Sequence, residues 1–150
     1  MPPTTQHVAR TDAGLASELR VAVMRLRRRL AIEREPGNDI GIGVMAVLAC
    51  LYRRGELSVG ELAAYERVQP PSMTRAVRKL EEKGYVARRP HETDGRQVLV
   101  SLTDAGRDLV LADRRRRDEW LASRLRGLSA DDRAALRAAL PILDRLAAED

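Results

Sequence analysis

Residues 58–84 read SVGELAAYERVQPPSMTRAVRKLEEKG, and this stretch decides the fold. It opens on Ser58 and Glu61, which have the spacing of a capping box. In that motif the hydroxyl accepts a hydrogen bond from the amide three residues on, and the carboxylate accepts one from the cap amide. A short helix is therefore predicted from this cap through about Tyr65.

A second helix is predicted directly after the first, over residues 70–83. Pro70 and Pro71 stand at its start, where a missing N–H leaves no hydrogen bond unmade. Gly84 is placed as its C-terminal stop. Two helices joined by a short turn are the arrangement of a helix-turn-helix.

This second helix has one apolar face and one polar face. Met73, Val77 and Leu80 recur at helical spacing and are expected to pack inward. A helix fits the major groove of DNA, where arginines can read guanine bidentately and smaller polar residues touch bases weakly or bind phosphate. Taken alone, these polar residues fit an ordinary solvated face equally well. The opposite, exposed face carries Ser72, Thr74, Arg75, Arg78 and Lys79.

A two-stranded β-ribbon is predicted next. Residues 85–89 form one short strand, residues 97–102 alternate polar and apolar as the other, and Asp94-Gly95 marks the hairpin turn between them. Asp94 has the spacing to hold the Arg96 guanidinium in a charge-assisted pair, and a braced arginine suits a narrow minor groove. A plain surface salt bridge is the alternative. The arginines that bracket the hairpin are Arg88, Arg89 and Arg96.

Long helices are predicted on both sides of this unit. Residues 12–34 carry one continuous apolar stripe, and residues 41–53 form a second helix. The arginine run at 25–29 lies mostly off the stripe and is interpreted as a solvated face. The stripe consists of Leu19, Val23, Leu26 and Leu30.

Two further helices are predicted after the ribbon. Thr103 caps one that reaches about Arg126, and Ser129 with Asp132 is interpreted as another capping box at the start of the last. Pro141 lies inside this last helix and should kink it. The chain is thus expected to be mainly α, with a small β-ribbon.

Length, composition and charge limit the function classes. The chain has 150 residues, enough for one domain, and a net charge of +5. Residues 67–96 hold eight basic and four acidic side chains, so most of the positive excess lies there, which fits a nucleic-acid partner without proving one. No stretch is long and apolar enough to cross a membrane, and residues 1–10 lack the core of a secretory signal. The expected compartment is the cytoplasm.

Cysteine and histidine are scarce. Cys50 alone excludes a disulfide within the chain, and with only His7 and His91 beside it no metal site and no cofactor are predicted. Cys50 is interpreted as a core residue rather than a redox sensor. Trp120 is expected to anchor an interface rather than line an effector pocket, and His91 to be a plain loop residue rather than a phosphate contact.

These residues resemble the MarR family of bacterial transcription regulators. The resemblance extends to the flanking helices, which sit where that family places its dimerisation helices. Three turn positions depart from the usual pattern, with Glu66 and Arg67 where an apolar residue and glycine are common and Gln69 where a serine-type cap is common. The motifs that carry the resemblance, with their spacing kept, are Ser72-Met73-x-Arg75, Leu80-Glu81, Gly84-Tyr85-Val86, Asp94-Gly95-Arg96 and Thr103-x-x-Gly106.

The resemblance implies a winged helix-turn-helix homodimer that binds double-stranded DNA. The protein is expected to act as a repressor. It divides the chain into an N-terminal dimerisation helix at 11–35, a DNA-binding lobe at 40–102 and C-terminal dimerisation helices at 103–150. A small-molecule effector would bind between the first, second and fifth helices. Carried over by position, the wing contacts are Asp94 and Arg96, and those of the recognition helix are Pro71, Ser72, Thr74, Arg75, Arg78 and Lys79.

An enzyme and a protein-interaction module are the two alternatives to a DNA-binding regulator. An enzyme is not expected, because the chain has no P-loop, no H-E-x-x-H, no G-x-S-x-G and no Rossmann glycine set. A winged helix used as a protein–protein interaction module, without specific DNA binding, predicts a neutral or apolar recognition face. The cations at Arg75, Arg78, Lys79 and Arg96 argue against that alternative.

Overall fold

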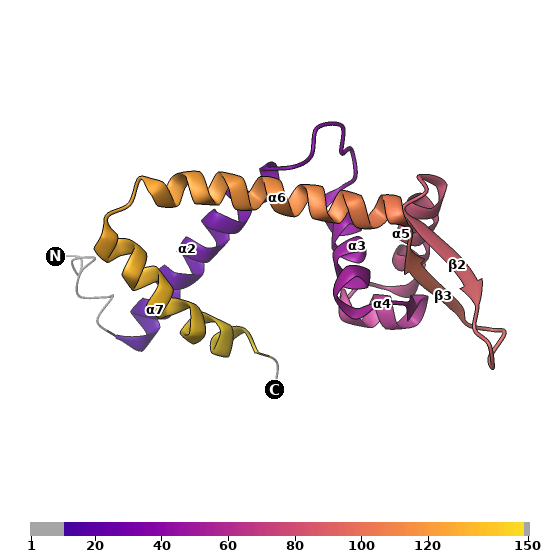
Figure 1. Cartoon of the computed structure of the whole chain (residues 1–150). Coiled ribbons are helices and arrows are strands. Elements are labelled where there is room, and N and C mark those ends of the chain that lie inside the picture. The colour runs from indigo at the N-terminus through magenta and orange to yellow at the C-terminus, as the bar shows by residue number, and fades with distance from the viewer. Residues whose placement is uncertain (1–10, 149–150) are drawn as a thin grey trace.

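The computed structural model describes residues 11–148 as six helices and a small antiparallel sheet (Figure 1). The predicted fold class, mainly α with a winged helix-turn-helix, is confirmed. The termini at 1–10 and 149–150, which include His7 and the stretch expected to lack a secretory signal, lie outside the described residues. The elements in order are α2 (Asp12–Ile32), α3 (Ile42–Arg54), β1 (Leu57–Ser58), α4 (Val59–Tyr65), α5 (Pro70–Glu82), β2 (Val86–Pro90), β3 (Val98–Leu102), α6 (Asp104–Arg126) and α7 (Ala130–Ala147).

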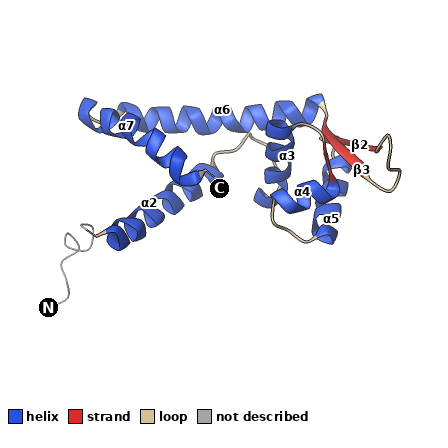
Figure 2. Ribbon diagram, turned by 90° about the horizontal axis from the view of Figure 1, so that it is seen from below, coloured by secondary structure: helices blue, strands red, loops and turns tan. Residues whose placement is uncertain are grey.

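The molecule has two parts joined by one helix. Helices α3, α4 and α5 and the sheet form a lobe, whereas α2 and α7 lie apart from it (Figures 1 and 2). Helix α6 begins on the lobe and extends to the other part, so it belongs to both. No helix of residues 11–148 is long and apolar enough to span a membrane.

The sheet has one strand more than the ribbon predicted from sequence. Its order is β1-β3-β2, with β2 and β3 paired as expected from Val86↔Leu102 to Pro90↔Val98. The correction is β1, which pairs with β3 through Leu57↔Val100. Its two residues are too few to show an alternating pattern, and they become a strand because Leu57 is buried beside β3.

The apolar core lies entirely in the lobe and the first half of α6. Cys50 is 1% exposed within it, which confirms its interpretation as a core residue. Burial raises the pKa of its thiol, so the thiolate that oxidants attack is disfavoured. Helix α7, by contrast, has no buried residue. The largest fully buried apolar side chains are Ile40, Leu48, Leu62, Met73 and Leu80.

The helix caps follow the sequence with one exception. The capping box of α4 is complete, since Glu61 N–H donates to Ser58 Oγ at 3.1 Å and Ser58 N–H donates to Glu61 Oε2 at 2.7 Å. Ser129 accepts from Asp132 N–H at 3.0 Å, but the Asp132 carboxylate makes no return bond among the described residues. The predicted second box is therefore half formed, because an aspartate is one methylene shorter than the glutamate of that motif. Pro141 lies inside α7 as expected, and the kink stays a prediction.

The start of α6 fits tightly against the end of α5. Thr103 N–H donates to Tyr85 O at 3.1 Å and Thr103 Oγ1 donates to Gly84 O at 2.6 Å. One turn later, a Cβ on Gly106 would lie 2.1 Å from Tyr85 O, well inside van der Waals contact. Glycine at 106 is thus required by the backbone approach.

A buried carboxylate fixes the loop between α2 and α3. Asp113 of α6 is 0% exposed and accepts from Glu35 N–H at 2.7 Å and Asn38 Nδ2 at 2.9 Å. The Arg117 guanidinium lies 3.5 Å from the same carboxylate, and Asn38 Oδ1 in turn accepts from Ile40 N–H at 3.0 Å. This loop leads the chain from α2 into the lobe, so the contact sets how the two parts are joined.

We expect Gly106→Ala to destabilise the protein by roughly 1–3 kcal/mol, the usual cost of overpacking. Urea unfolding followed by circular dichroism measures it. Gly60→Ala is the matched control, because its Cβ would meet only Ser58 Oγ at 3.9 Å. Equal stability of the two variants would contradict the close approach.

Asp113→Ala should lower the free energy of unfolding by about 3 kcal/mol, because it leaves buried donors without an acceptor. Asp118→Ala, which removes an exposed carboxylate from the same helix, should change it by less than about 0.5 kcal/mol. Thermal and urea unfolding of both variants test this. A neutral Asp113→Ala would show that the loop does not depend on the carboxylate.

Candidate nucleic-acid interface

Helix α5 presents a positively charged face to solvent. Met73, Val77 and Leu80 are at most 1% exposed and hold the opposite face against the lobe core, as the spacing predicted. The first turn of α5 contains no acidic residue. The predicted contact residues all lie on the exposed side, and they are Pro71, Ser72, Thr74, Arg75, Arg78 and Lys79.

Two of these side chains are oriented by local hydrogen bonds. One Arg75 guanidinium nitrogen donates to Ser72 Oγ at 3.2 Å, which holds the arginine near the first turn while leaving most of its donors available. Thr74 Oγ1 donates to Pro70 O at 3.0 Å, so its hydroxyl can act only as an acceptor toward a ligand. Arg78 and Lys79 make no side-chain hydrogen bond or ion pair within residues 11–148.

The tip of the hairpin is ordered by its own side chains. Asp94 Oδ1 accepts from Arg96 N–H at 3.1 Å and Oδ2 accepts from Gln97 Nε2 at 3.3 Å. His91 Nδ1 accepts from Thr93 N–H at 3.2 Å and from Asp94 N–H at 3.3 Å, so the histidine is part of the turn. Sequence reasoning missed that role, although an H-x-x-D pattern within a hairpin turn is a usable signal.

The expected pairing of Asp94 with the Arg96 guanidinium is wrong. Aspartates bond readily to the backbone two residues on, and Asp94 is engaged in that way. No carboxylate of the described chain lies within 4 Å of the Arg96 guanidinium, and the side chain is exposed. Arg96 is therefore placed by its backbone and free to pair with a ligand.

The other two hairpin arginines are engaged within the protein. Arg88 lies 2.6 Å from the Glu81 carboxylate at the end of α5. Arg89 donates two hydrogen bonds to the Glu56 carboxylate, of 2.5 and 3.1 Å, and its guanidinium lies 3.6 Å from Glu92. The hydrogen bonds that Arg89 donates to the Glu56 carboxylate raise the pKa of Arg89 above its ordinary value. These pairs attach the wing to the lobe, so a DNA phosphate would have to compete with them.

A shallow groove of about 680 Å³ runs between the helices and the hairpin. Its lining includes Thr74 of α5, Arg96 and Gln97 of the hairpin, and Ser58 and Glu61 at the start of α4. A helix flanked by a basic hairpin across a groove is the geometry of a winged helix-turn-helix, in which the helix enters the major groove and the wing reaches the minor groove.

The end of α5 is tied to the α2–α3 loop. Lys83 Nζ lies 2.9 and 3.0 Å from the two carboxylate oxygens of Asp39. This bond lowers the pKa of Asp39 and raises that of Lys83, which favours the charged form of both. The loop held by Asp113 thus reaches the recognition helix itself.

The fold and this face define a DNA-binding transcription regulator. The MarR family model matches residues 43–98. An HTH-type transcriptional regulator of Mycobacterium bovis is 47% identical over 89% of this chain and 92% of its own length. The chain belongs to the MarR family, whose members are regulators and not enzymes.

Solved structures agree with this assignment. A transcriptional regulator of Pseudomonas aeruginosa has 34% identity and a TM-score of 0.82, covering 94% of this chain and 99% of its own. A mutant of MepR from Staphylococcus aureus, solved with an oligodeoxyribonucleotide, has 22% identity and a TM-score of 0.67, covering 88% and 97%. The latter likeness shows the fold alone.

We expect Arg78→Ala to weaken binding to a specific DNA site by about 1–3 kcal/mol and to relax base preference at one position. Arg96→Ala should also weaken binding, but base preference at the positions that α5 reads should stay unchanged. Fluorescence anisotropy with a set of single-base variants measures both. Arg28→Ala, on the exposed face of α2, is the control for a lost charge. Unchanged affinity in either variant would remove that residue from the interface.

Proposed function

We propose that this chain acts as a homodimeric repressor that binds a pseudo-palindromic operator. The observation that carries the DNA-binding assignment is the exposed set of Arg75, Arg78, Lys79 and Arg96, cations that the lobe leaves without a carboxylate partner among residues 11–148. A dimer on promoter DNA occupies the duplex that RNA polymerase needs, which is the simplest route to repression.

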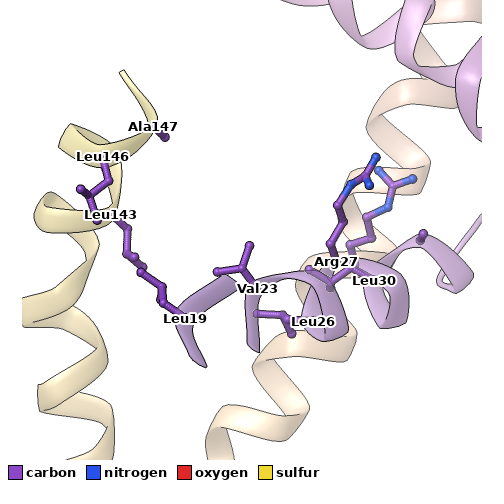
Figure 3. Close-up of a pocket in the computed structure, with 10 residues that line it drawn as sticks. Leu19, Val23, Leu26, Arg27, Leu30, Leu143, Leu146 and Ala147 are labelled. Atoms are coloured by element: carbon purple, nitrogen blue, oxygen red, sulfur yellow. The ribbon is translucent and has the colours of Figure 1, made fainter. Parts of the chain in front are cut away.

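The apolar faces of α2 and α7 support the dimer. The α2 stripe, including Leu19, Val23 and Leu26, faces Leu143 and Leu146 of α7 across an apolar gap of about 680 Å³ (Figure 3). Leu146 is 69% exposed and α7 has no buried residue, although it is a well-capped helix. A second copy that inserts its own α2 and α7 would bury both faces.

The proposed dimer gives each region of the chain a role. Residues 11–35 and 103–150 join the two protomers, and residues 40–102 bind DNA. Two lobes related by a twofold axis address two half-sites about 10 base pairs apart. The Trp120 ring of α6 contacts the guanidinium group of Arg29 of α2, 4.6 Å from the ring centroid, and that of Arg124, at 5.4 Å. The anchoring role expected for it stays a prediction.

The proposed small effector would bind between the lobe and the long helices. A cavity of about 190 Å³ lies between the end of α2, α3 and α6, the three helices expected to enclose it. Apolar side chains such as Met45 and Val110 line it together with Arg34 and Arg117. Arg117 also contacts Asp113, so a ligand here would act on the loop that joins the two parts. Release from DNA then follows if the ligand prefers a lobe spacing that does not match the operator.

The remaining alternative is a winged helix that binds another protein. It would leave the charged face without a binding partner, and its binding would not depend steeply on salt.

A DNA-binding protein of this kind acts in the cytoplasm, on the nucleoid.

Binding to the DNA upstream of its own gene tests the function. A mobility shift at two salt concentrations, with competitor DNA, should show a band that survives competitor and weakens steeply at higher salt. Footprinting would then give the half-site spacing. A shift that competitor abolishes, repeated with operators selected from random sequence, would favour the protein-binding alternative.

Leu143→Glu and Val23→Glu should each halve the molar mass in solution, because they place a charge in the proposed dimer interface. Light scattering after size exclusion measures the mass, and circular dichroism confirms that the helices remain. Arg137→Glu, on the same helix as Leu143 and exposed, is the matched control. Wild-type mass for both leucine and valine variants would exclude this interface.

A further inference from the structure

The turn before the recognition helix contains an arginine in an unfavourable backbone conformation. Arg67 has φ of +52°, and no other non-glycine residue within 11–148 has a positive φ. At the three other described positions with positive φ, between +79° and +83°, the chain uses glycine, at Gly37, Gly55 and Gly84. A side chain at such a position costs stability that glycine would not.

The hydrogen bonds of this turn explain the conformation but not the arginine. Arg67 N–H donates to Ala64 O at 3.2 Å and Val68 N–H donates to Ala63 O at 3.0 Å, the pattern that ends a helix with one left-handed residue. Both bonds come from the backbone, so glycine would make them equally well. The Arg67 side chain is exposed and makes no hydrogen bond, ion pair or ring contact within the described chain.

The start of α5 lacks the donors that usually bind phosphate at a helix N-terminus. Pro70 and Pro71 carry no N–H, and the amides of Ser72 and Met73 both donate to Gln69 O, at 3.0 and 3.1 Å. The backbone amides that attract phosphate at other helix N-termini are therefore missing or occupied at the start of α5. A phosphate beside this end of the helix needs a side-chain donor.

We propose that Arg67 binds a backbone phosphate of the DNA at the edge of the major groove that α5 enters. It precedes the helix by three residues, directly before the first turn of α5, and its guanidinium matches phosphate bidentately. It replaces the amide donors lost at Pro70 and Pro71, and it adds affinity without reading sequence. This inference rests on the proposed DNA-binding function.

The test compares Arg67→Gly with Arg67→Lys in binding and in stability. Arg67→Gly should raise Tm by roughly 2–5 °C, because the left-handed strain is relieved. Its affinity for an operator duplex should fall roughly tenfold at low salt, and the slope of log K against log salt should fall by about two for a dimer, one phosphate per protomer. Arg67→Lys, which keeps the charge, should retain most of the slope. Base preference should stay unchanged in both variants.

Arg115→Ala, which removes an exposed arginine of α6 from outside the lobe, controls for net charge and should leave the slope unchanged. Wild-type affinity and slope in Arg67→Gly would overturn the proposal, as would an equal loss in Arg115→Ala. A lower Tm in Arg67→Gly would mean that the arginine serves the fold instead. Failure of the wild-type protein to bind any duplex would refute the proposed function through a separate measurement.

Discussion

The approach of the α6 backbone to Tyr85 is the constraint on which the rest of the structure depends. Helix α6 is continuous, so the position of its first turn on the lobe decides where its far end meets α2 and α7. Thr103 fixes that turn by hydrogen bonds to the backbone at Gly84 and Tyr85, and Gly106 lets the helix come close enough. In a dimer, the distance between the two DNA-binding lobes would be set by this contact between the first turn of α6 and the backbone at Gly84 and Tyr85.

The α2–α3 loop provides the second fixed point. Asp113 holds it from α6 and Lys83 holds it from the end of α5, so one loop contacts both the connecting helix and the recognition helix. Carboxylate–amide bonds in a buried site have little tolerance for displacement. A ligand that moves Arg117 would therefore displace Asp113 and the loop that Asp113 binds. Because Lys83 binds the same loop, the proposed effector would also shift the recognition helix.

The sequence predicted the helices, the caps and the charged face because these depend on local patterns. The spacing of Met73, Val77 and Leu80 was enough to assign the exposed side of α5. Long-range partners could not be predicted: Asp113 looks like any acid in an arginine-rich helix, and its partners are 75 and 78 residues away. The division of the hairpin arginines into the paired Arg88 and Arg89 and the unpaired Arg96 depends on distant glutamates in the same way.

The exposed apolar faces of α2 and α7 have a consequence for the life of the protein in a cell. In a single chain, leucines such as Leu140 and Leu146 are exposed to solvent. Exposed apolar surface promotes aggregation, and the unpacked helix is accessible to proteases. In the proposed dimer, association would protect only folded, paired chains, and the paired fraction would rise with concentration. The concentration of the regulator would then set its degradation rate as well as its occupancy of DNA sites. At low concentration a larger fraction of chains is unpaired, so each chain is degraded faster on average.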